Sequence, residues 1–185
     1  MRKVTRADVL DYKTYNDRRE EFRARILEEK AKRRIHVGEH LTFLFESTDT
    51  MLYQVQEMMR LEQTVRESEI LHEIDTYNQL LGDDGELGCT LLIEIDDAAD
   101  RSRKLAAWLG LPGHLYIKLD DGALARAVWD PRQVGEGRLS SVQYLKFPVG
   151  ARVPVAIGSD HPDLRIEGAL SDAQRETLRL DARSV

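Results

Sequence analysis

Hydrophobic and polar positions follow two different patterns along the chain, and the pattern changes near residue 110. Before that point, apolar residues mostly recur every three or four positions, which is typical of helices with one buried face. Two uninterrupted apolar runs break this pattern and predict strands covered on both faces. The strands lie at 41–45 and 89–95, and the helices at about 15–35, 50–66, 69–81 and 98–109, after a short first helix beginning near Thr5.

The chain after residue 110 has the short apolar runs of β-structure. A hairpin is indicated by Asp120, Asp121 and Gly122, which separate two such runs. Ser171 and Gln174 have the spacing of a capping box and open a last helix. The predicted strands are 115–119, 123–129, 140–147 and 152–157, and the last helix ends at about Arg183.

These elements define an α+β fold, in which a helix-rich N-terminal half packs on a mainly antiparallel sheet and a helix closes the chain. No repeat, low-complexity tract or linker composition interrupts the sequence, so we expect a single domain over residues 1–185. Within it we distinguish a basic helical arm, a strand-helix-helix-strand-helix unit and a β-rich part with the final helix. These three parts cover residues 1–36, 37–110 and 111–185.

The charge of the chain is negative overall but unevenly distributed. In total, 27 basic and 33 acidic residues give a net charge of −6, which argues against nucleic acid or an anionic membrane as the main partner. Residues 1–36 hold 12 basic against 7 acidic residues (+5), which leaves 15 against 26 (−11) for the rest. This contrast predicts that the N-terminal segment docks on the acidic remainder, on a partner or on an anion.

The single cysteine, Cys89, excludes an intrachain disulfide and suits a reducing cytoplasm, where we expect the protein to reside. No apolar run is long enough for a membrane span, and Met1 to Lys3 lead into no signal-peptide core. Cys89 begins a predicted buried strand and has no base nearby in the sequence, so we interpret it as an inert thiol.

The helix predicted after residue 50 carries polar side chains within or beside its apolar stripe. On a helical projection Glu62 falls inside the stripe, while Gln54 and Glu57 border it. One hypothesis places these residues, with Arg60, over a polar pocket. The other lets the end of the helix leave the core, with Glu57 and Arg60 forming an ordinary i, i+3 ion pair.

The long N-terminal helix shows the same feature with the opposite charge, because Arg19 and Arg33 fall on its apolar stripe. In one hypothesis, either arginine pairs with a buried acid such as Glu62 or Glu94, or clamps an anionic ligand. In the other, the aliphatic stems cover apolar surface while the guanidinium groups reach water.

Two groups of residues suggest a metal. Glu69 and His72 have the Glu-x-x-His spacing of di-iron bundles, but both project away from the apolar stripe and no second copy exists. Glu94 ends a buried strand and is followed by three aspartates, an arrangement that suits either a divalent cation or a helix cap. We expect no metal, and the ligand set that would hold one is Glu57, Glu62, Glu94 and Asp97.

Common catalytic motifs are missing from the sequence. It contains no Gly-x-Ser-x-Gly elbow, no P-loop and no Gly-x-Gly-x-x-Gly. The five histidines show no ligand spacing, and His161-Pro162 predicts a surface turn.

Several short segments nevertheless recur in one order in a bacterial family. They are Phe43-Leu-Phe-Glu46, Thr50, Gln54-Val-Gln-Glu-Met-Met-Arg60, Tyr77-Asn78, Gly85-Glu-Leu87, Thr90-Leu-Leu-Ile-Glu-Ile95 and Asp160-His-Pro162. Through them nearly the whole chain resembles the uncharacterised family known as domain of unknown function 3501. The residues that match its pattern are Glu46, Gln54, Gln56, Glu57, Arg60, Tyr77, Asn78, Glu86 and Glu94, whereas Cys89 and His72 do not belong to it.

The resemblance implies a setting rather than a reaction. Members of the family are often encoded beside a rubrerythrin and an iron–sulfur oxidoreductase, which implies an accessory role in peroxide defence or electron transfer. The leading hypothesis is therefore a binding module for a rubrerythrin-like or iron–sulfur partner, without a tightly bound organic cofactor. A homodimer is left open.

Whether the chain is an enzyme is also left open. In that alternative, Glu57, Arg60 and Glu94 are the catalytic residues of a metal-independent enzyme that acts on an anionic small molecule. The candidate ligand-binding residues are Gln54, Arg19, Arg33, Glu46, Tyr77 and Asn78. A carboxylate-ligated metal protein is the second alternative.

Overall fold

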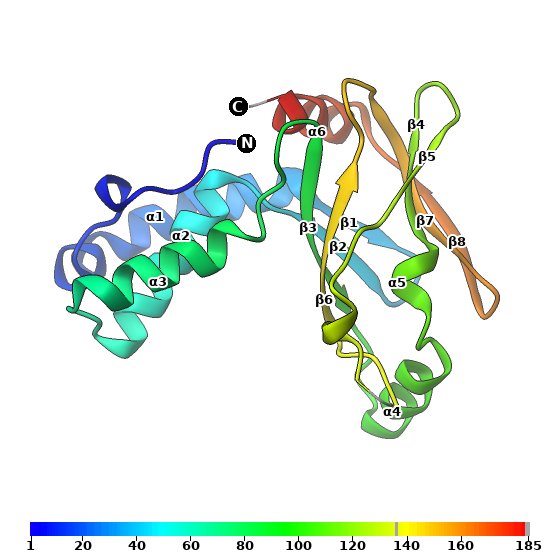
Figure 1. Ribbon diagram of the computed structural model, residues 1–185, viewed down its shortest axis with the longest axis horizontal. Coiled ribbons are helices and arrows are strands. Elements are labelled where there is room, and N and C mark those ends of the chain that lie inside the picture. The colour runs from blue at the N-terminus through cyan, green and yellow to red at the C-terminus, as the bar shows by residue number, and fades with distance from the viewer. Residues whose placement is uncertain (136, 184–185) are drawn as a thin grey trace.

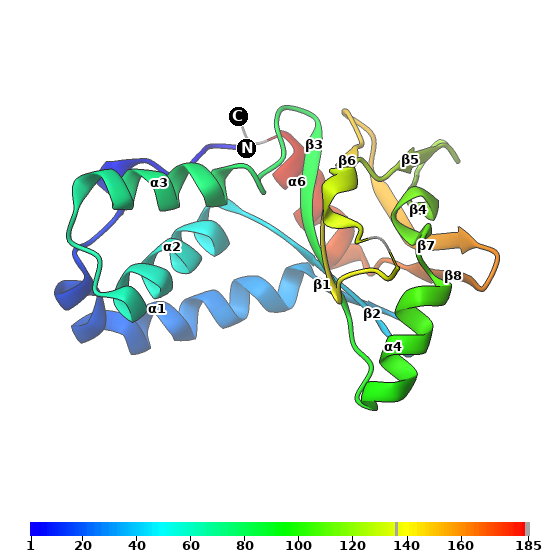
Figure 2. The same cartoon turned by 60° about the horizontal axis from the view of Figure 1, so that its bottom comes forward.

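The computed structural model describes residues 1–135 and 137–183 and confirms the α+β class. Its helical arm extends to one side of two antiparallel sheets that pack face to face (Figures 1 and 2). Across the described residues, each helix is too short or too polar to span a bilayer.

The helical arm of the structure is larger than the basic segment 1–36 predicted from the sequence: it contains the N-terminal segment and three helices, which have a hydrophobic core of their own. Ser47 caps the second helix through the N–H of Thr50, and Gln63 ends it in the left-handed conformation. The core consists of Val4, Val9, Met51, Val55, Met59, Ile70, Ile74 and Leu81. The elements are η1 (Arg6–Asp8), α1 (Tyr12–Arg33), α2 (Thr48–Glu62) and α3 (Glu67–Asn78).

Two four-stranded sheets enclose the larger core. Sheet A has the strand order β1-β2-β3-β6, and sheet B has the order β5-β4-β7-β8, with every named pair antiparallel. Inward residues such as Phe43, Leu91 and Ile157 are fully buried between the sheets. The strands are β1 (Arg34–Val37), β2 (Leu41–Phe45), β3 (Glu86–Ile93), β4 (Leu115–Leu119), β5 (Leu124–Arg126), β6 (Val142–Pro148), β7 (Pro154–His161) and β8 (Leu164–Ala169).

Helices close the two ends of this pair of sheets. The C-terminal helix α6 (Asp172–Arg183) inserts Leu178 and Ala182 into the core. It begins with the predicted capping box, in which Ser171 and Gln174 exchange hydrogen bonds. The helix α4 (Ala98–Ala107) lies at the other end, as Figure 1 shows, where Leu105 and the following Trp108 are buried in the core. The remaining elements are α5 (Leu111–His114) and η2 (Pro131–Gln133).

The structure corrects the predicted elements in three places. The chain leaves α1 at Arg33 and continues directly as β1, where Ile35 and Val37 point inward, whereas the sequence predicted helix to residue 35. Strand β8 was not predicted, because its alternating residues are only half-buried. The predicted sheet is divided into two, since β1 to β3 and β6 pair separately from the rest.

His161 is a further correction. The sequence predicted a surface turn at His161-Pro162, but His161 ends β7 and is buried, and the turn comes after it. Its backbone N–H donates to Ser159 Oγ, and its Nδ1 accepts from the N–H of Asp163. The histidine is therefore part of the strand end rather than of the loop.

The junction between the arm and sheet A, where the segment after α3 packs on β3, requires glycine at position 88. At Gly88 on β3, an added Cβ would overlap the carbonyl oxygen of Leu80 and approach the N–H of Gly82. The segment after α3 can therefore lie directly against the strand only because residue 88 has no side chain.

We expect Gly88→Ala to lower the free energy of unfolding by about 1–3 kcal/mol, because backbone must move to admit the methyl group. Chemical denaturation measures this change. Gly110→Ala is the matched control, since its Cβ would enter open space at φ −86°. Equal denaturation midpoints for the two variants would show that the strand at Gly88 does not pack closely against the carbonyl of Leu80.

Candidate functional site

Glu57, the main candidate from the sequence, lies between α1 and α2 at the centre of a hydrogen-bonded cluster. Its Oε1 accepts from Tyr15 Oη at 2.7 Å and from Arg19 Nε at 2.8 Å. Its Oε2 accepts from Arg19 Nη2 at 3.0 Å and from Arg60 at 3.3 Å. Arg19 therefore pairs with an acid, though not with Glu62 or Glu94 as expected, and Glu57 and Arg60 form the i, i+3 pair.

The electrostatics of Glu57 do not suit a general base near neutral pH. Burial raises the pKa of Glu57, but hydrogen bonds from Arg19, Tyr15 and Arg60 outweigh this effect and lower the pKa to about 2. A carboxylate with so low a pKa takes up protons poorly, because catalytic bases work best with a pKa near the working pH. The cluster instead ties α1 to α2.

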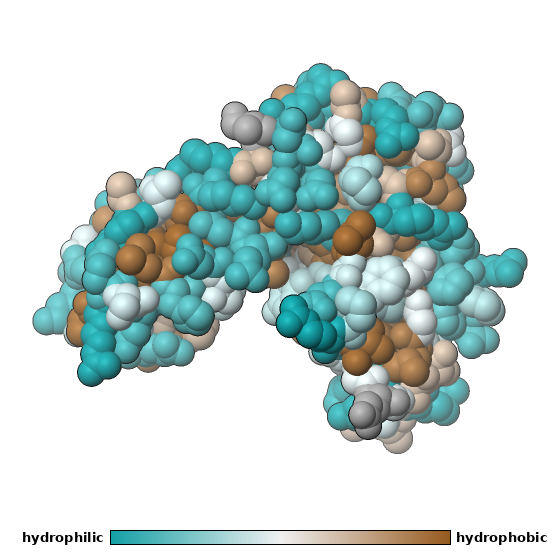
Figure 3. Space-filling model, viewed as in Figure 1, coloured by the Kyte–Doolittle hydropathy of each residue, from teal (hydrophilic) through white to brown (hydrophobic). Residues whose placement is uncertain are grey.

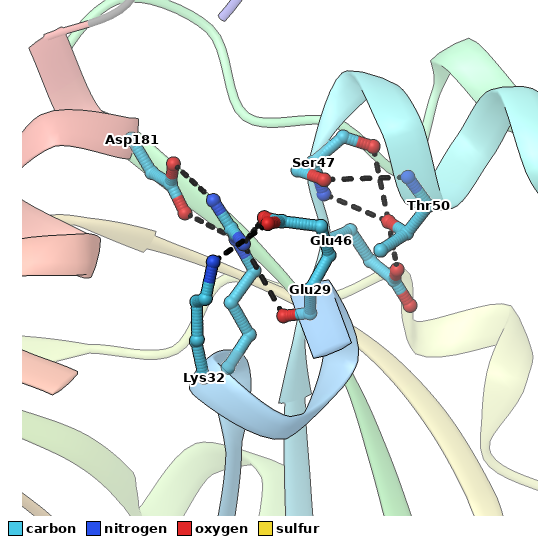
Figure 4. Close-up of polar contacts among 7 residues, drawn as sticks. Glu29, Lys32, Glu46, Ser47, Thr50 and Asp181 are labelled. Carbon is cyan, nitrogen blue, oxygen red and sulfur yellow. Dashed lines mark hydrogen bonds and ion pairs between the residues drawn. The ribbon is translucent and has the colours of Figure 1, made fainter. Parts of the chain in front are cut away.

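Arg33 joins the arm to the rest of the molecule through Asp181, which is labelled together with Glu29 in Figure 4. Its guanidinium group contacts Asp181 of α6 through two hydrogen bonds of 2.7 and 3.0 Å and Glu29 at 2.6 Å. Both side chains of the bidentate pair are about 10% exposed. Arg33 therefore binds the protein's own carboxylates, and the guanidinium edge that faces Asp181 is occupied.

Glu46 is also occupied internally. Thr50 Oγ1 donates to one carboxylate oxygen at 2.7 Å, as Figure 4 shows, and Thr90 donates to the other at 2.6 Å. Burial, with the nearby charge of Glu46, raises the pKa of the Cys89 thiol, which agrees with an inert cysteine. The group links β2, α2 and β3 where the arm leaves the sheets.

Two residues from the family pattern hold backbone segments. Asn78 makes a reciprocal pair of hydrogen bonds with the N–H and carbonyl of Val4, at 2.8 and 2.9 Å. Gln56 makes the same kind of pair with Leu10. These amides attach the N-terminal segment to α3 and α2. Gln54 and Tyr77 remain half-buried and share one 3.5 Å hydrogen bond.

Glu94 lies elsewhere, on the outer side of sheet A. Its carboxylate accepts from Thr42, whose hydroxyl also contacts His36 at 2.8 Å. No contact within the described part of the chain joins Glu94 to Glu57 or Arg60. The three candidate catalytic residues are thus not assembled into one pocket.

The alternative metal ligands are also separate from one another. Glu62 is exposed, and Asp97 caps α4 by accepting from the N–H of Asp100. In residues 1–135 and 137–183, no three His, Cys, Asp or Glu side chains are grouped to hold an ion. Glu69 and His72 are exposed on α3, as the helical projection predicted.

Sequence reasoning missed a polar network on the outer face of sheet B. His114 Nδ1 lies 2.9 Å from Asp160, and Arg126 donates to the other oxygen of Asp160 at 2.6 Å. Hydrogen bonds from Arg126 and His114 lower the pKa of Asp160 to about 2. The Asp160-His-Pro162 motif was recognised in the sequence, but it names only one member of the network. His114 and Arg126 come close to Asp160 through the pairing of β4 with β5 and β7.

An apolar hollow lies on the outer face of sheet A, beside the segment that leads from α3 into β3. Val128 is 55% exposed, Tyr144 44% and Val142 37%, although all three are large hydrophobic residues. Val128, Tyr144, Leu80 and Trp129 line an open hollow of about 380 Å³. Figure 3 shows the notch between the arm and the rest of the molecule, with hydrophobic side chains reaching the surface there.

By its fold, the chain is an α+β protein in which a helical arm is attached to a pair of antiparallel sheets. The chain belongs to the family DUF3501, described as proteins of unknown function, whose model matches residues 3–182. It is similar to a novel protein of unknown function from Burkholderia pseudomallei K96243, known from a crystal structure at 1.90 Å resolution. The two are 28% identical, with a TM-score of 0.88 over 97% of this chain and 99% of the other. The comparison with curated proteins found no match.

We expect Arg33→Ala to lower the free energy of unfolding by about 3–5 kcal/mol, because Asp181 would be left buried without its partner. Thermal or urea denaturation measures the loss. The control is Arg23→Ala on the same helix, which removes an exposed arginine and should change stability by less than about 0.5 kcal/mol. The double variant Arg33→Met, Asp181→Leu should recover much of the loss, and a double variant as unstable as Arg33→Ala would contradict this account.

The low pKa of Glu57 predicts a pH dependence. Its contribution to stability is complete above its ordinary pKa of 4.5 and is lost as the pH falls toward the folded value of about 2. Glu57→Gln should therefore lower the unfolding free energy at pH 7 by about 2 kcal/mol and weaken the acid destabilisation below pH 5. Glu20→Gln removes an 81% exposed neighbour of Arg19 and should have little effect. Parallel pH profiles for wild type and Glu57→Gln would refute the assignment.

Proposed function

We propose that the protein is a binding module whose partner protein docks in the apolar hollow between the arm and sheet A. The observation that carries the proposal is the exposure of Val128, Tyr144 and Val142 together on one sheet face. Solvent-exposed apolar clusters flanked by polar residues are typical of protein interaction sites. Aromatic residues such as Tyr144 and Trp129 are enriched in the energetically important centres of such sites.

The backbone beneath the hollow supports a preformed docking face. The side-chain amide of Gln133 donates to the carbonyl of Tyr144 at 3.1 Å and accepts from its N–H at 2.8 Å. Val128 makes two backbone hydrogen bonds of 2.8 Å with Lys146. The backbone N–H and carbonyl groups at the edge of β6 are therefore largely hydrogen-bonded within the chain. A partner would contact side chains there rather than free backbone groups.

The polar candidates support the same function by what they already bind. Glu57, Arg33, Glu46 and Asn78 are satisfied by groups of the protein itself. In this proposal Arg33 and Glu46 hold the arm against the sheets and α6, and Glu57 and Asn78 hold the elements of the arm to one another, so that the arm has a fixed position beside sheet A.

The partner we propose is a rubrerythrin-like or iron–sulfur protein in the cytoplasm, with this chain as an accessory in oxidative stress. This part of the proposal rests only on the gene neighbourhood that the family resemblance implies. A metal-independent enzyme is the second candidate, favoured by one observation: Asp160 orients His114 through Nδ1, which leaves Nε2 available as a base.

The test is binding between the purified chain and a rubrerythrin-like protein or an iron–sulfur protein from the same organism, measured by titration calorimetry. We expect Tyr144→Asp to weaken the interaction at least about tenfold, because a carboxylate would be placed in the centre of the apolar contact. Leu124→Asp is the matched control, since Leu124 is 43% exposed on the outer face of sheet B.

Four outcomes distinguish the hypotheses. Binding that Tyr144→Asp weakens and Leu124→Asp preserves supports the docking face. Binding that neither substitution affects would move the partner to another surface, and absence of binding to both proteins would refute the proposed partners. A self-associated chain that Tyr144→Asp converts to a monomer would instead make the hollow the interface of a homodimer.

A further inference from the structure

Strand β8 forms an outer edge of sheet B, because it pairs with β7 on one side only. Figures 1 and 2 both show it at the margin of the molecule. The strand is six residues long and stands at the end of the order β5-β4-β7-β8. An edge of this length is a template for another strand unless its side chains prevent the approach.

The free hydrogen-bonding groups of this edge follow from the ladder with β7. The N–H of Leu170 donates to the carbonyl of Val155 at 2.9 Å, which makes these two residues a hydrogen-bonded pair. Since bonded and non-bonded pairs alternate in an antiparallel ladder, the backbone groups of Arg165, Glu167 and Ala169 point away from β7. In the described part of the chain, no hydrogen bond from another segment occupies these groups.

Strand β1 approaches β8 from the inner face and does not pair with it. An added Cβ at Gly38 would overlap the side chain of Ile166, and one at Gly168 would lie 3.1 Å from Val37. Side chains of the inner face therefore meet at this corner, while the two strands belong to different sheets. The three residues of β8 with free backbone groups are all exposed.

The charges on this edge are of opposite sign and lie on one face. Arg165 and Glu167 are two positions apart, so both project from the outer face of sheet B. Tyr116 and Lys118 hold the Glu167 carboxylate at 3.0 and 3.2 Å. Arg165 lies opposite Asp160, but both oxygens of that carboxylate are already bonded in the network described above. Among residues 1–135 and 137–183, Arg165 has no ionic partner.

A second copy of β8 would complement these charges in one register. In a symmetric antiparallel pair centred on Ile166, Arg165 of each copy lies opposite Glu167 of the other, and both residues supply free backbone groups. On the inner face, Ile166 then lies opposite Ile166, and Leu164 lies opposite Gly168. Pairs centred on Arg165 or on Glu167 would instead place like charges opposite each other, which is destabilising.

Strand β8 lacks the features by which proteins commonly prevent edge-to-edge pairing. It contains neither proline nor lysine, and its ladder with β7 runs without a register shift. Edge charges of one sign would repel a second copy in every register. The pair of Arg165 and Glu167 instead attracts a second copy in the register centred on Ile166.

We propose that β8 is the interface of a homodimer, in which the β8 strands of two copies pair antiparallel about a two-fold axis at Ile166. The two four-stranded B sheets would thereby become one continuous sheet. This interface lies on another surface than the apolar hollow at sheet A and does not depend on the proposed protein partner.

The experiment is sedimentation velocity of the full chain at concentrations up to about 0.1 mM, a range that includes weak specific complexes. We expect a dimer whose fraction rises with concentration. Arg165→Glu should weaken dimerisation at least about tenfold, because two attractive contacts become repulsive across the two-fold axis. Glu167→Arg should weaken it for the same reason. Since Arg165 has no ionic partner in the described part of the chain, its variant keeps the test independent of folding.

A mixture of the two variants tests the register itself. The Arg165→Glu chain carries two negative charges on this edge and the Glu167→Arg chain carries two positive ones, so each repels its own kind and complements the other. We expect an equimolar mixture to form a heterodimer about as readily as the wild type forms its homodimer. A mixture that stays monomeric would overturn the register.

The control is Arg23→Glu, which makes the same charge reversal at an exposed position on α1 and should leave dimerisation unchanged. Equal weakening by Arg23→Glu and Arg165→Glu would show a general effect of net charge and would overturn the proposal. A wild-type chain that is monomeric at every concentration would overturn it as well. A dimer that Tyr144→Asp abolishes and Arg165→Glu preserves would place the interface at the apolar hollow instead.

Discussion

The ion pair between Arg33 and Asp181 is the constraint on which the arrangement of the molecule depends. It joins the last residue of α1 to the C-terminal helix, two segments separated by 148 positions in the chain. At that point the arm, sheet A and the helix that closes the sheets all meet. The bidentate contact between these two buried charges restricts the orientation of α1 relative to α6. A rotation that separated them would leave each charge buried without its partner, which is strongly destabilising.

This constraint explains why one chain contains two hydrophobic cores without a flexible linker between them. The core of the arm and the core between the sheets share no residue, yet glycine at position 88, the Glu46 hydrogen bonds and the Arg33 pair fasten their junction. The apolar notch exists because the arm is held beside the sheets rather than folded over them.

Much of the fold was predictable from the sequence, and the assembly of the site was not. The apolar run at 41–45 and the hairpin around Gly122 gave correct elements because local pattern and turn chemistry agree there. Strand β1 was missed because its four residues continue a helical sequence, and only pairing with β2 makes it a strand. Arg19 and Arg33 were recognised as charges on apolar stripes, but their partners Glu57 and Asp181 depend on tertiary packing. His114 and Asp160 are 46 positions apart, and the periodicity of apolar residues within single helices or strands does not predict which residues meet across such a separation.

The direct continuation of α1 into β1 has a mechanical consequence. With 22 residues, α1 is about 33 Å long at about 1.5 Å per residue, and no loop separates it from the edge strand of sheet A. A force applied near Tyr12 therefore acts on β1 through a rigid lever instead of being absorbed by a hinge. Tilting of the arm would be transmitted as a change in the twist of sheet A, whose outer face is the floor of the apolar notch.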